Sequence, residues 1–344
     1  MGEAVGGGRR PTLRDVAARA EVSFKTVSRV VNGEPGVSPA LAGRVRTAIE
    51  ELQFRPDAGA SSLRRADRRT HSVGLLLEDV SNPFSGAIQR AVEDEAVPRG
   101  VLVFSGSVDE DTTRERDLVR AFAARRVDGL VLAPASTDQA YLEPEVRGGT
   151  AVVCIDREAR GLPADSVITT NRTGAAEGVG HLAAAGHRRI AFLGDLSSIL
   201  TAGQRHEGYR DAMARHGLPV DPALVVHDLR DATAADGAAT GLLDRADPPT
   251  ALFTAQNLIT IGAVRALRRL RTEHAVAVVG FDDFPTADLL SPGITVVAQD
   301  PARMGRLAAT LLFGRIDGEA APPRAHVVPT TLVRRGSGEI PPPR

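Results

Sequence analysis

The side chains best suited to chemistry lie in a short segment near the N-terminus, between Val22 and Asn32. At helical spacing, its outward residues are one aromatic ring, two basic groups and two hydroxyls: Phe24, Lys25, Thr26, Ser28 and Arg29. Groups of these kinds bind base edges and phosphate oxygens, and no acidic residue interrupts the segment. The segment is therefore a candidate nucleic-acid contact, with an ordinary solvated helix face as the alternative.

Three predicted helices, at 12–20, 23–31 and 38–52, position this segment. Each begins at a hydroxyl residue that can cap a helix start: Thr12, Ser23 and Ser38. The apolar residues that recur on one face of these helices are Leu13, Val16, Ala17, Ala20, Val27, Val30, Val31, Leu41, Val45, Ile49 and Leu52. Three short helices with a tight second turn predict a helix-turn-helix module. Periodicity alone also fits a generic three-helix cap.

The basic charge of the chain is concentrated at its N-terminus. Residues 1–70 hold thirteen Lys and Arg against eight Asp and Glu, whereas the other 274 residues hold 29 against 35. This asymmetry favours binding to a polyanion through the N-terminal module alone. At 344 residues, two or three domains are expected. No apolar run reaches the ~20 residues of a membrane span and no secretory signal opens the chain, so we expect a cytoplasmic protein without a membrane partner.

Motifs for catalysis or metal binding are weak or missing. Residues 178–183 formally fit the dinucleotide fingerprint, but they lie in an Ala-rich helical stretch with no strand directly before it. The sequence has no Walker phosphate loop, no G-x-S-x-G nucleophile elbow and no HExxH motif. Its one cysteine, Cys154, lies in an apolar run and is interpreted as a buried strand residue. We therefore expect no catalytic residue, no cofactor and no metal site.

The N-terminal motifs closely resemble those of a known family. The run at 12–33, TLRDVAARAEVSFKTVSRVVNG, is similar to the N-terminal signature of the lactose-repressor (LacI/GalR) family of bacterial transcription regulators. Residues 54–57 and 60–63 resemble the family's hinge helix, which inserts a leucine into the DNA minor groove. Asp57 and Gly59 depart from the family pattern, and a flexible Arg-rich linker is the alternative. The expected DNA contacts are Thr12, Ser23, Phe24, Lys25, Thr26, Ser28, Arg29, Asn32, Ala60 and Leu63.

The rest of the chain alternates strand-like and helical stretches. Strands are expected at 73–77, 101–104, 129–132, 151–155, 189–193, 224–226, 251–254 and 277–281. Helices are expected at about 84–97, 112–126, 173–186, 202–216, 233–246 and 258–271. This alternation predicts an α/β fold with parallel sheets, whose ligands bind outside the carboxyl ends of the strands.

Motifs in the body extend the resemblance over nearly the whole chain. They are SNPF at 81–84, VDGL at 127–130, IDR at 155–157, GHRRI at 186–190, RHEGY at 205–209, VGFDD at 279–283 and QDP at 299–301. The resemblance implies a two-lobed effector domain, similar to periplasmic sugar-binding proteins, with crossings near 156–160, 292–300 and 324–330. The expected domains are a helix-turn-helix at 10–56, a hinge at 57–70, and an effector-binding and dimerisation domain at 71–344, with lobe 1 at about 71–157 and 298–326 and lobe 2 at about 158–297 and 327–340.

Sugar sites combine carboxylate, amide and guanidinium groups with an aromatic face. The effector-binding candidates are Phe84, Arg157, Arg205, Gln256 and Asp282. Structural alternatives are a core position for the ring, a capping role for the carboxylate, and an ion pair of Arg205 with Glu207 or Asp211. Gln256 and Asn257 stand where the family more often has Asn-Asp, which leaves the identity of the effector open.

Together these features predict a ligand-responsive, DNA-binding transcriptional regulator, most simply an allosteric repressor. One helix-turn-helix reads few base pairs, so a homodimer on a pseudo-palindromic double-stranded operator is expected. The effector is expected to be a small neutral or mildly acidic sugar-like molecule bound between two lobes. The alternative is a cytoplasmic sugar-binding or sugar-modifying protein whose α-helical cap does not bind DNA. The sequence leaves open induction versus co-repression, the operator, and dimer versus tetramer.

Overall fold

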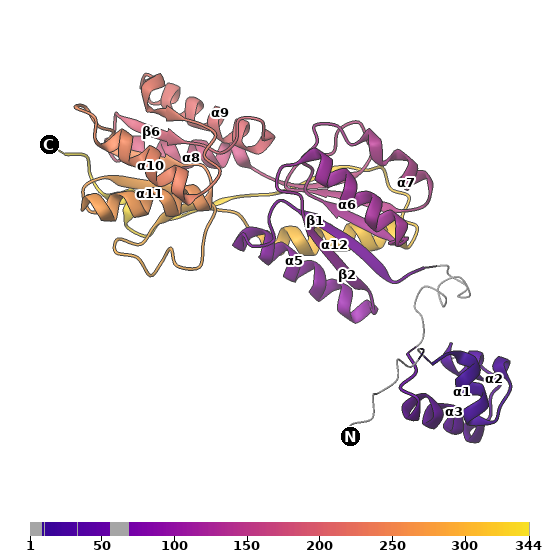
Figure 1. Ribbon diagram of the computed structural model, residues 1–344. Coiled ribbons are helices and arrows are strands. Elements are labelled where there is room, and N and C mark those ends of the chain that lie inside the picture. The colour runs from indigo at the N-terminus through magenta and orange to yellow at the C-terminus, as the bar shows by residue number, and fades with distance from the viewer. Residues whose placement is uncertain (1–8, 10, 33, 56–68, 344) are drawn as a thin grey trace, which may run out of the picture. The chain divides into compact units, whose positions relative to one another are not determined.

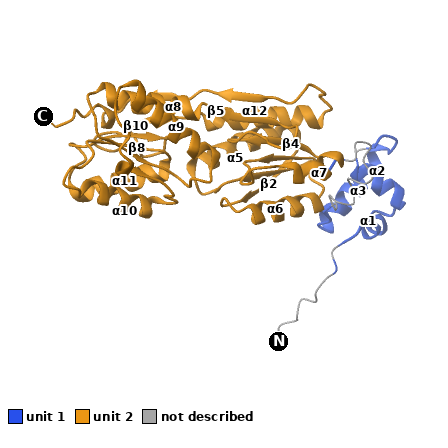
Figure 2. Ribbon diagram, turned by 90° about the horizontal axis from the view of Figure 1, so that it is seen from above, with its two compact units in different colours: residues 1–70 blue, residues 71–344 orange. Residues whose placement is uncertain are grey.

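The structure is a computed structural model that describes residues 9, 11–32, 34–55 and 69–343. Contacts divide the chain into two compact units, 1–70 and 71–344, which Figure 2 shows in blue and orange. Within the described ranges, no helix is both long and apolar enough to cross a membrane. Each unit has an apolar core of its own, so each is described by itself.

The first unit contains three short helices, α1 (Leu13–Ala20), α2 (Phe24–Val31) and α3 (Pro39–Glu51) (Figure 1). They begin where the sequence predicts, because Thr12, Ser23 and Ser38 each accept a backbone amide of the first turn. Thr12 and Asp15 form a reciprocal capping box. The hydrogen bonds from the Thr12 hydroxyl and amide hold the pKa of the Asp15 carboxyl below its usual value.

A small apolar core holds these three helices together. Its buried members are Val16, Ala17, Ala20, Val27, Val45, Ala48 and Phe54. The periodicity places Leu41 on the apolar face of α3 and predicts that it is buried, but Leu41 is exposed, because it lies in the first turn, ahead of the turns that contribute Val45 and Ala48 to the core. Phe54 follows α3 and extends the core to the start of the hinge-like motif.

The second unit contains two six-stranded sheets, one in each lobe. The sheet of lobe 1 has the strand order β11-β5-β4-β3-β1-β2, and its neighbours are all parallel. Its strands are β1 (Ser72–Leu77), β2 (Leu102–Ser107), β3 (Gly129–Leu132), β4 (Ala151–Ile155), β5 (Asp165–Thr169) and β11 (Ala325–Val328). Helices α5 (Pro83–Ala96) and α12 (Pro301–Ile316) cover one face, and α6 (Thr112–Ala124) covers the other (Figure 2). The short helix α7 (Glu143–Arg147) precedes β4.

The sheet of lobe 2 has the order β12-β10-β9-β8-β6-β7, with β12 antiparallel to β10 and the other pairs parallel. Its strands are β6 (Ile190–Leu193), β7 (Val225–Val226), β8 (Ala251–Thr254), β9 (Ala277–Phe281), β10 (Thr295–Ala298) and β12 (Thr331–Val333). Helices α8 (Asn171–Ala184) and α9 (Leu200–Arg215) cover one face. Helices α10 (Ala232–Leu243) and α11 (Asn257–Leu270) cover the other (Figure 2).

The chain passes between the lobes after β5, after β10 and after β11 (Figure 1). The first passage lies near Thr170, later than the predicted 156–160, because β5 pairs with β4 before the chain leaves lobe 1. The predicted lobe limit at 157 is therefore wrong, and residues 158–169 belong to lobe 1. The end of lobe 1 predicted at 326 is two residues too early, because β11 continues to Val328 alongside β5.

Among the α-helices and strands described above, six lie outside the predicted set: β5, β10, β11, β12, α7 and α12. Helix α12 does carry helix signals, since Asp300 caps it, Pro301 opens it, and Met304, Ala308 and Leu312 recur on its buried side. Strand β5 has a weaker signal because it begins with the charged residue Asp165. Burial of that carboxylate depends on a partner from far along the chain, Arg315, whose Nε donates to it at 2.8 Å.

Candidate functional site

The exposed side of α2 carries the predicted DNA-contacting residues. Val27 is fully buried, and Phe24 and Lys25 on the other side are exposed. Within the part of the chain that the structure describes, the Lys25 ammonium makes no hydrogen bond or ion pair. An unpaired ammonium and an exposed ring at the start of a helix are groups that can reach the edges of bases in a major groove.

Other predicted contacts have partners within the first unit. The Ser23 hydroxyl accepts the Thr26 amide at 3.1 Å and shares a hydrogen bond with the Thr26 hydroxyl at 2.9 Å. Asn32 Nδ2 donates to the Ser28 hydroxyl at 3.3 Å, and Arg29 Nε lies 3.9 Å from a Glu34 carboxylate oxygen. Thr12 caps α1 as described above. Ala60 and Leu63 lie outside the described residues.

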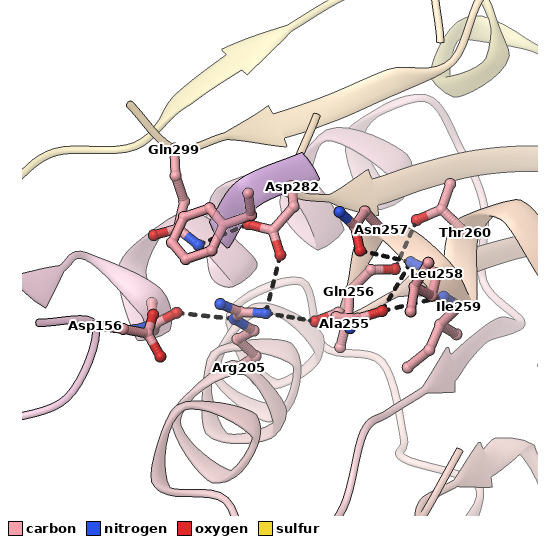
Figure 3. Close-up of polar contacts among 12 residues, drawn as sticks. Asp156, Arg205, Ala255, Gln256, Asn257, Leu258, Ile259, Thr260, Asp282 and Gln299 are labelled. Atoms are coloured by element: carbon pink, nitrogen blue, oxygen red, sulfur yellow. Dashed lines mark hydrogen bonds and ion pairs between the residues drawn. The ribbon is translucent and has the colours of Figure 1, made fainter. Parts of the chain in front are cut away.

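In the second unit, a buried ion pair lies in lobe 2 between Arg205 and Asp282, with Nη1 and Oδ2 3.4 Å apart (Figure 3). Arg205 comes from α9, and its Nε donates to Asn171 Oδ1 while Nη1 donates to the Ala255 carbonyl, both at 2.8 Å. Its guanidinium lies over the Phe281 ring, 4.0 Å from the ring centre. These contacts hold a planar cationic group in one orientation.

The alternative pairing of Arg205 with Glu207 or Asp211 is not formed. Arg172 lies 3.1 Å from Glu207 and 2.6 Å from Asp211, so it takes both carboxylates on the exposed side of α9. The opposite, buried side of this helix therefore presents Arg205 to the carboxyl ends of the strands, at Asp282. This places two of the predicted effector residues in direct contact.

Asp282 follows β9 in the left-handed backbone region, at φ 70°. Its Oδ1 accepts a hydrogen bond from Gln299 Nε2 at 2.6 Å, and its backbone amide donates to the Val297 carbonyl at 2.9 Å. Asp156, at the end of β4, has the same conformation at φ 67°. A left-handed non-glycine residue is uncommon, and such residues gather at functional sites.

Lobe 1 contributes Arg157 and its partners to the same region. The Arg157 guanidinium donates to both oxygens of Glu110, at 2.8 and 2.5 Å, and to the Pro134 carbonyl at 2.7 Å. Asp156 Oδ2 lies 3.5 Å from Arg157 Nε. Burial raises the pKa of Asp156, and the nearby Arg157 and Arg205 oppose that rise. We call Asp156, Arg157, Arg205, Asp282 and Gln299 the interlobe cluster.

Two predicted effector residues have structural roles instead of contacts with this cluster. Gln256 caps α11, because its Oε1 accepts the amides of Leu258 at 2.7 Å and Ile259 at 3.3 Å (Figure 3). Phe84 is half-buried and packs against the core of lobe 1. Ligand contact by either residue stays a prediction.

A reciprocal amide contact joins the two lobes. Asn257 Nδ2 donates to Asn82 Oδ1 at 2.8 Å, and Asn82 Nδ2 donates to Asn257 Oδ1 at 3.3 Å. Both side chains are buried, and they lie at the starts of α5 in lobe 1 and α11 in lobe 2. Each amide therefore bonds the other across the boundary between the lobes.

Several polar residues of this region are absent from the predicted set: Glu78, Glu110, Asp156, Asp195, Asn171 and Gln299. A simple signal was available for Glu78 and Asp156, because each carboxylate directly follows a predicted strand. Next to the cluster is a cavity of about 40 Å³ that receives residues from both lobes. Its lining includes Ser136 and Arg157 from lobe 1 and Leu200 from lobe 2.

The sequence matches two family descriptions. Residues 12–57 match the bacterial regulatory proteins of the lacI family, and residues 179–338 match a periplasmic binding protein-like domain. The HTH-type transcriptional regulator GalR of Escherichia coli K12 is 32% identical over 332 residues, covering 96% of both chains. The regulator CelR of Thermobifida fusca is 35% identical over 347 residues, covering 96% of this chain and 99% of CelR.

Solved structures give the same result for the whole chain. A CelR–cellobiose complex superposes with a TM-score of 0.69 at 32% identity, covering 95% of this chain and 100% of that one. A Lac repressor dimer bound to operator and the anti-inducer ONPF superposes with a TM-score of 0.81 at 25% identity, covering 96% and 99%.

A helix-turn-helix unit followed by a two-lobed periplasmic-binding-like domain defines a class of DNA-binding transcriptional regulators. Within that class, the chain belongs to the lacI family of bacterial regulatory proteins. The family and the fold predicted from the motifs at 12–33 and in the body are thereby confirmed.

Proposed function

We propose that this regulator is a cytoplasmic repressor whose operator affinity is controlled by a small sugar-like effector bound at the interlobe cluster. The observation that carries the proposal is the buried Arg205–Asp282 pair, which lies beside Asp156 of the other lobe. Planar groups of this kind bind vicinal hydroxyls. The CelR and Lac repressor structures, with cellobiose and ONPF, support a sugar-like ligand. The protein acts by binding, with no catalytic step.

For DNA, we propose that a homodimer places α2 of each protomer in successive major grooves of a pseudo-palindromic operator. The exposed Phe24 and Lys25 then face base edges. Thr12, Ser28 and Arg29 contact the phosphate backbone of the DNA or stabilise their own helices. Ala60 and Leu63 remain proposed contacts of the hinge. The Lac repressor dimer solved on its operator supports this arrangement.

The effector site and the DNA-binding unit are coupled through the relative position of the two lobes. The effector contacts residues of both, so it favours the arrangement of the lobes that completes its site. In this proposal, the Asn82–Asn257 contact forms in only one of two arrangements of the lobes. It is therefore part of the structure that switches between the two states. A change in lobe position alters the spacing of the two DNA-binding units in a dimer, which changes operator affinity.

The test uses operator fragments recovered with the purified full-length protein from genomic DNA. We expect Asp282→Ala to retain operator binding within about twofold, measured by fluorescence anisotropy, because the residue lies in the second unit. We expect the variant to lose the response to a sugar that changes operator affinity of the original protein.

Asp94→Ala is the matched control, since Asp94 is an exposed residue of α5 in an ion pair with Arg90. This variant should keep both operator binding and the sugar response. An Asp282→Ala protein that still responds to the sugar with unchanged affinity contradicts the assignment of the interlobe cluster as the effector site.

A further inference from the structure

We propose that the ligand of the interlobe cluster carries no anionic group and binds by donating hydrogen bonds from hydroxyl or amine groups. This inference rests on the proposed function and specifies the charge class of the effector. It narrows the neutral or mildly acidic sugar expected from the sequence, because it excludes phosphorylated sugars and sugar acids.

The first observation is the balance of charge around the cluster. Among the described residues, two guanidinium groups, Arg157 and Arg205, lie among five carboxylates. The five come from both lobes and follow strands β1, β2, β4, β6 and β9: Glu78, Glu110, Asp156, Asp195 and Asp282. With every group ionised, this set carries three more negative than positive charges.

The second observation is that the protein already uses several of the guanidinium donors. Arg157 donates through Nη1 and Nη2 to Glu110. Arg205 donates through Nε to Asn171 and through Nη1 to Ala255. An anionic ligand would have to compete with these partners, and each displaced buried partner would lose its own hydrogen bond.

The third observation is that the unused groups are mainly acceptors. In the described part of the chain, the Glu78 carboxylate has no hydrogen bond or ion pair. Asp195 uses Oδ1 to accept the Leu196 amide at 2.7 Å, and Oδ2 has no such partner. Gln299 Oε1 is buried and has no hydrogen-bond partner. A ligand that donates from hydroxyl or ammonium groups satisfies Asp195 Oδ2 and Gln299 Oε1, whereas a fully ionised phosphate has no proton to donate to them.

The pKa shifts of three carboxyls limit how much negative charge the set carries. Burial, together with Glu110 and Asp195, raises the pKa of Glu78 to about 8. Burial likewise raises the pKa of Asp156 and of Asp195. With these three carboxyls protonated, the two remaining carboxylates, Glu110 and Asp282, balance the two guanidinium groups, so in neither protonation state does the set have a net positive charge to attract an anion.

The adjoining cavity provides an independent sign of a ligand. Ser136 is only 9% exposed, and its hydroxyl has no hydrogen-bond partner among the residues that the structure describes. Arg157 Nε is also buried without one. Glu158 and Arg160, at the exposed edge of the cavity, offset each other in charge. A ligand hydroxyl can accept from Arg157 Nε and pair with the Ser136 hydroxyl, so a polyol matches both the donors and the acceptors.

The test is a set of matched ligands offered to the full-length protein and measured by calorimetry. The probes are D-galactose, D-ribose and cellobiose, each compared with its phosphorylated counterpart, and galactosamine as the amine-bearing form. For the sugar that binds best, we expect the phosphorylated form to bind at least tenfold more weakly, and an amine-bearing form to bind equally or more tightly.

Two variants separate charge exclusion from a merely structural effect. At about pH 9, above the Glu78 pKa of about 8, Glu78→Gln and Asp195→Asn each remove one negative charge with little change of shape, so each should narrow the ratio between the affinities for the neutral and phosphorylated ligands by severalfold. Asp94→Asn, on the exposed side of α5, is the control and should leave the ratio unchanged. A structural defect alone would weaken both ligands equally.

Each outcome decides between the two proposals. A phosphorylated sugar or sugar acid that binds more tightly than its neutral form, and is lost in Arg205→Lys, overturns the charge class but leaves the effector site intact. A neutral nucleoside that binds in place of every sugar supports the charge class and overturns the sugar assignment. If no ligand of any charge binds or alters operator affinity, the proposed function fails and this inference fails with it.

Discussion

At the scale of single residues, Lys25 offers the clearest test of DNA recognition. Its ammonium is exposed on α2 and is unpaired within the described residues, so it is free to donate to a base such as guanine. We expect Lys25→Ala to cost about 1–3 kcal/mol of operator binding and to relax preference at one symmetric pair of positions. Binding selection from a random duplex library measures this preference.

The control for this variant is Arg90→Ala, which removes an exposed basic residue from α5 in the second unit. It should leave both affinity and preference unchanged. If Lys25→Ala instead lowers the affinity for every duplex equally and reduces the salt dependence of binding, Lys25 contacts a phosphate and not a base.

Glu78 gives a second prediction at this scale, on stability against pH. Its pKa is raised from 4.5 to about 8 in the folded protein, so the folded state holds a proton that the unfolded state has lost between these values. Unfolding free energy therefore falls as pH rises from about 4.5 to 8 through this group. Glu78→Gln has no carboxyl to ionise, so its unfolding free energy should not fall with pH in this way. We expect the variant to be more stable than the original protein by about 1–3 kcal/mol at pH 8.5 and hardly at all near pH 5.

Thermal unfolding of the original protein and of Glu78→Gln across this pH range measures the difference. Glu143→Gln is the control for the loss of an exposed carboxylate, because Glu143 is half-exposed beside Arg147. A Glu78→Gln protein whose gain in melting temperature is the same at pH 5 and pH 8.5 would show that the carboxyl is not perturbed.

At the scale of elements, helix pairs in the second unit approach closely through glycine. A Cβ at Gly208 of α9 would lie 2.1 Å from the Arg172 carbonyl oxygen and 2.9 Å from the Ala175 Cβ of α8. Backbone atoms cannot move aside as a flexible side chain can, so we expect Gly208→Ala to destabilise the protein by about 2–4 kcal/mol.

The same helix provides the control for that prediction. A Cβ at Gly203 would have no neighbouring atom within 4 Å, so Gly203→Ala should stabilise by about 0.5–1 kcal/mol through helix propensity alone. Denaturant titration of both variants compares the two positions. Equal effects at the two glycines would mean that α8 and α9 do not require this close approach.

At the scale of the whole molecule, DNA binding and ligand binding are assigned to different units. The second unit, 71–344, contains both sheets and five core clusters that hold them, with no cluster shared with the first unit among the described residues. We expect the fragment 71–344 to fold and to bind the effector with the affinity of the full chain. Because residues 1–70 carry the basic excess, operator binding should fall to background.

Calorimetry with the effector and anisotropy with the operator test this fragment. Its circular dichroism spectrum and cooperative unfolding provide the check that it is folded. A folded fragment that still binds operator with the salt dependence of the full chain would place DNA binding in the second unit.

The sequence alone determined much of this protein. Helix starts at Thr12, Ser23 and Ser38 are local events, decided by a hydroxyl and the amides of the next turn. The alternation of strands and helices from 73 to 281 is equally local, because burial on both faces of a parallel sheet gives short, continuous apolar runs. Three residues of the cluster, Arg157, Arg205 and Asp282, were predictable because their motifs stand at strand ends or on the helix beside them.

Only the tertiary structure decided what these residues meet. Arg205 and Asp282 are 77 residues apart, Arg157 and Glu110 are 47 apart, and Asn82 and Asn257 are 175 apart. Which of these distant residues meet depends on strand order and on where the chain passes between the lobes, and periodicity does not encode either feature. The charge balance of the cluster also exists only after folding, because carboxylates from five strand ends are brought together from separate segments. For the same reason, strand β5 became part of lobe 1 through its pairing with β4 and β11.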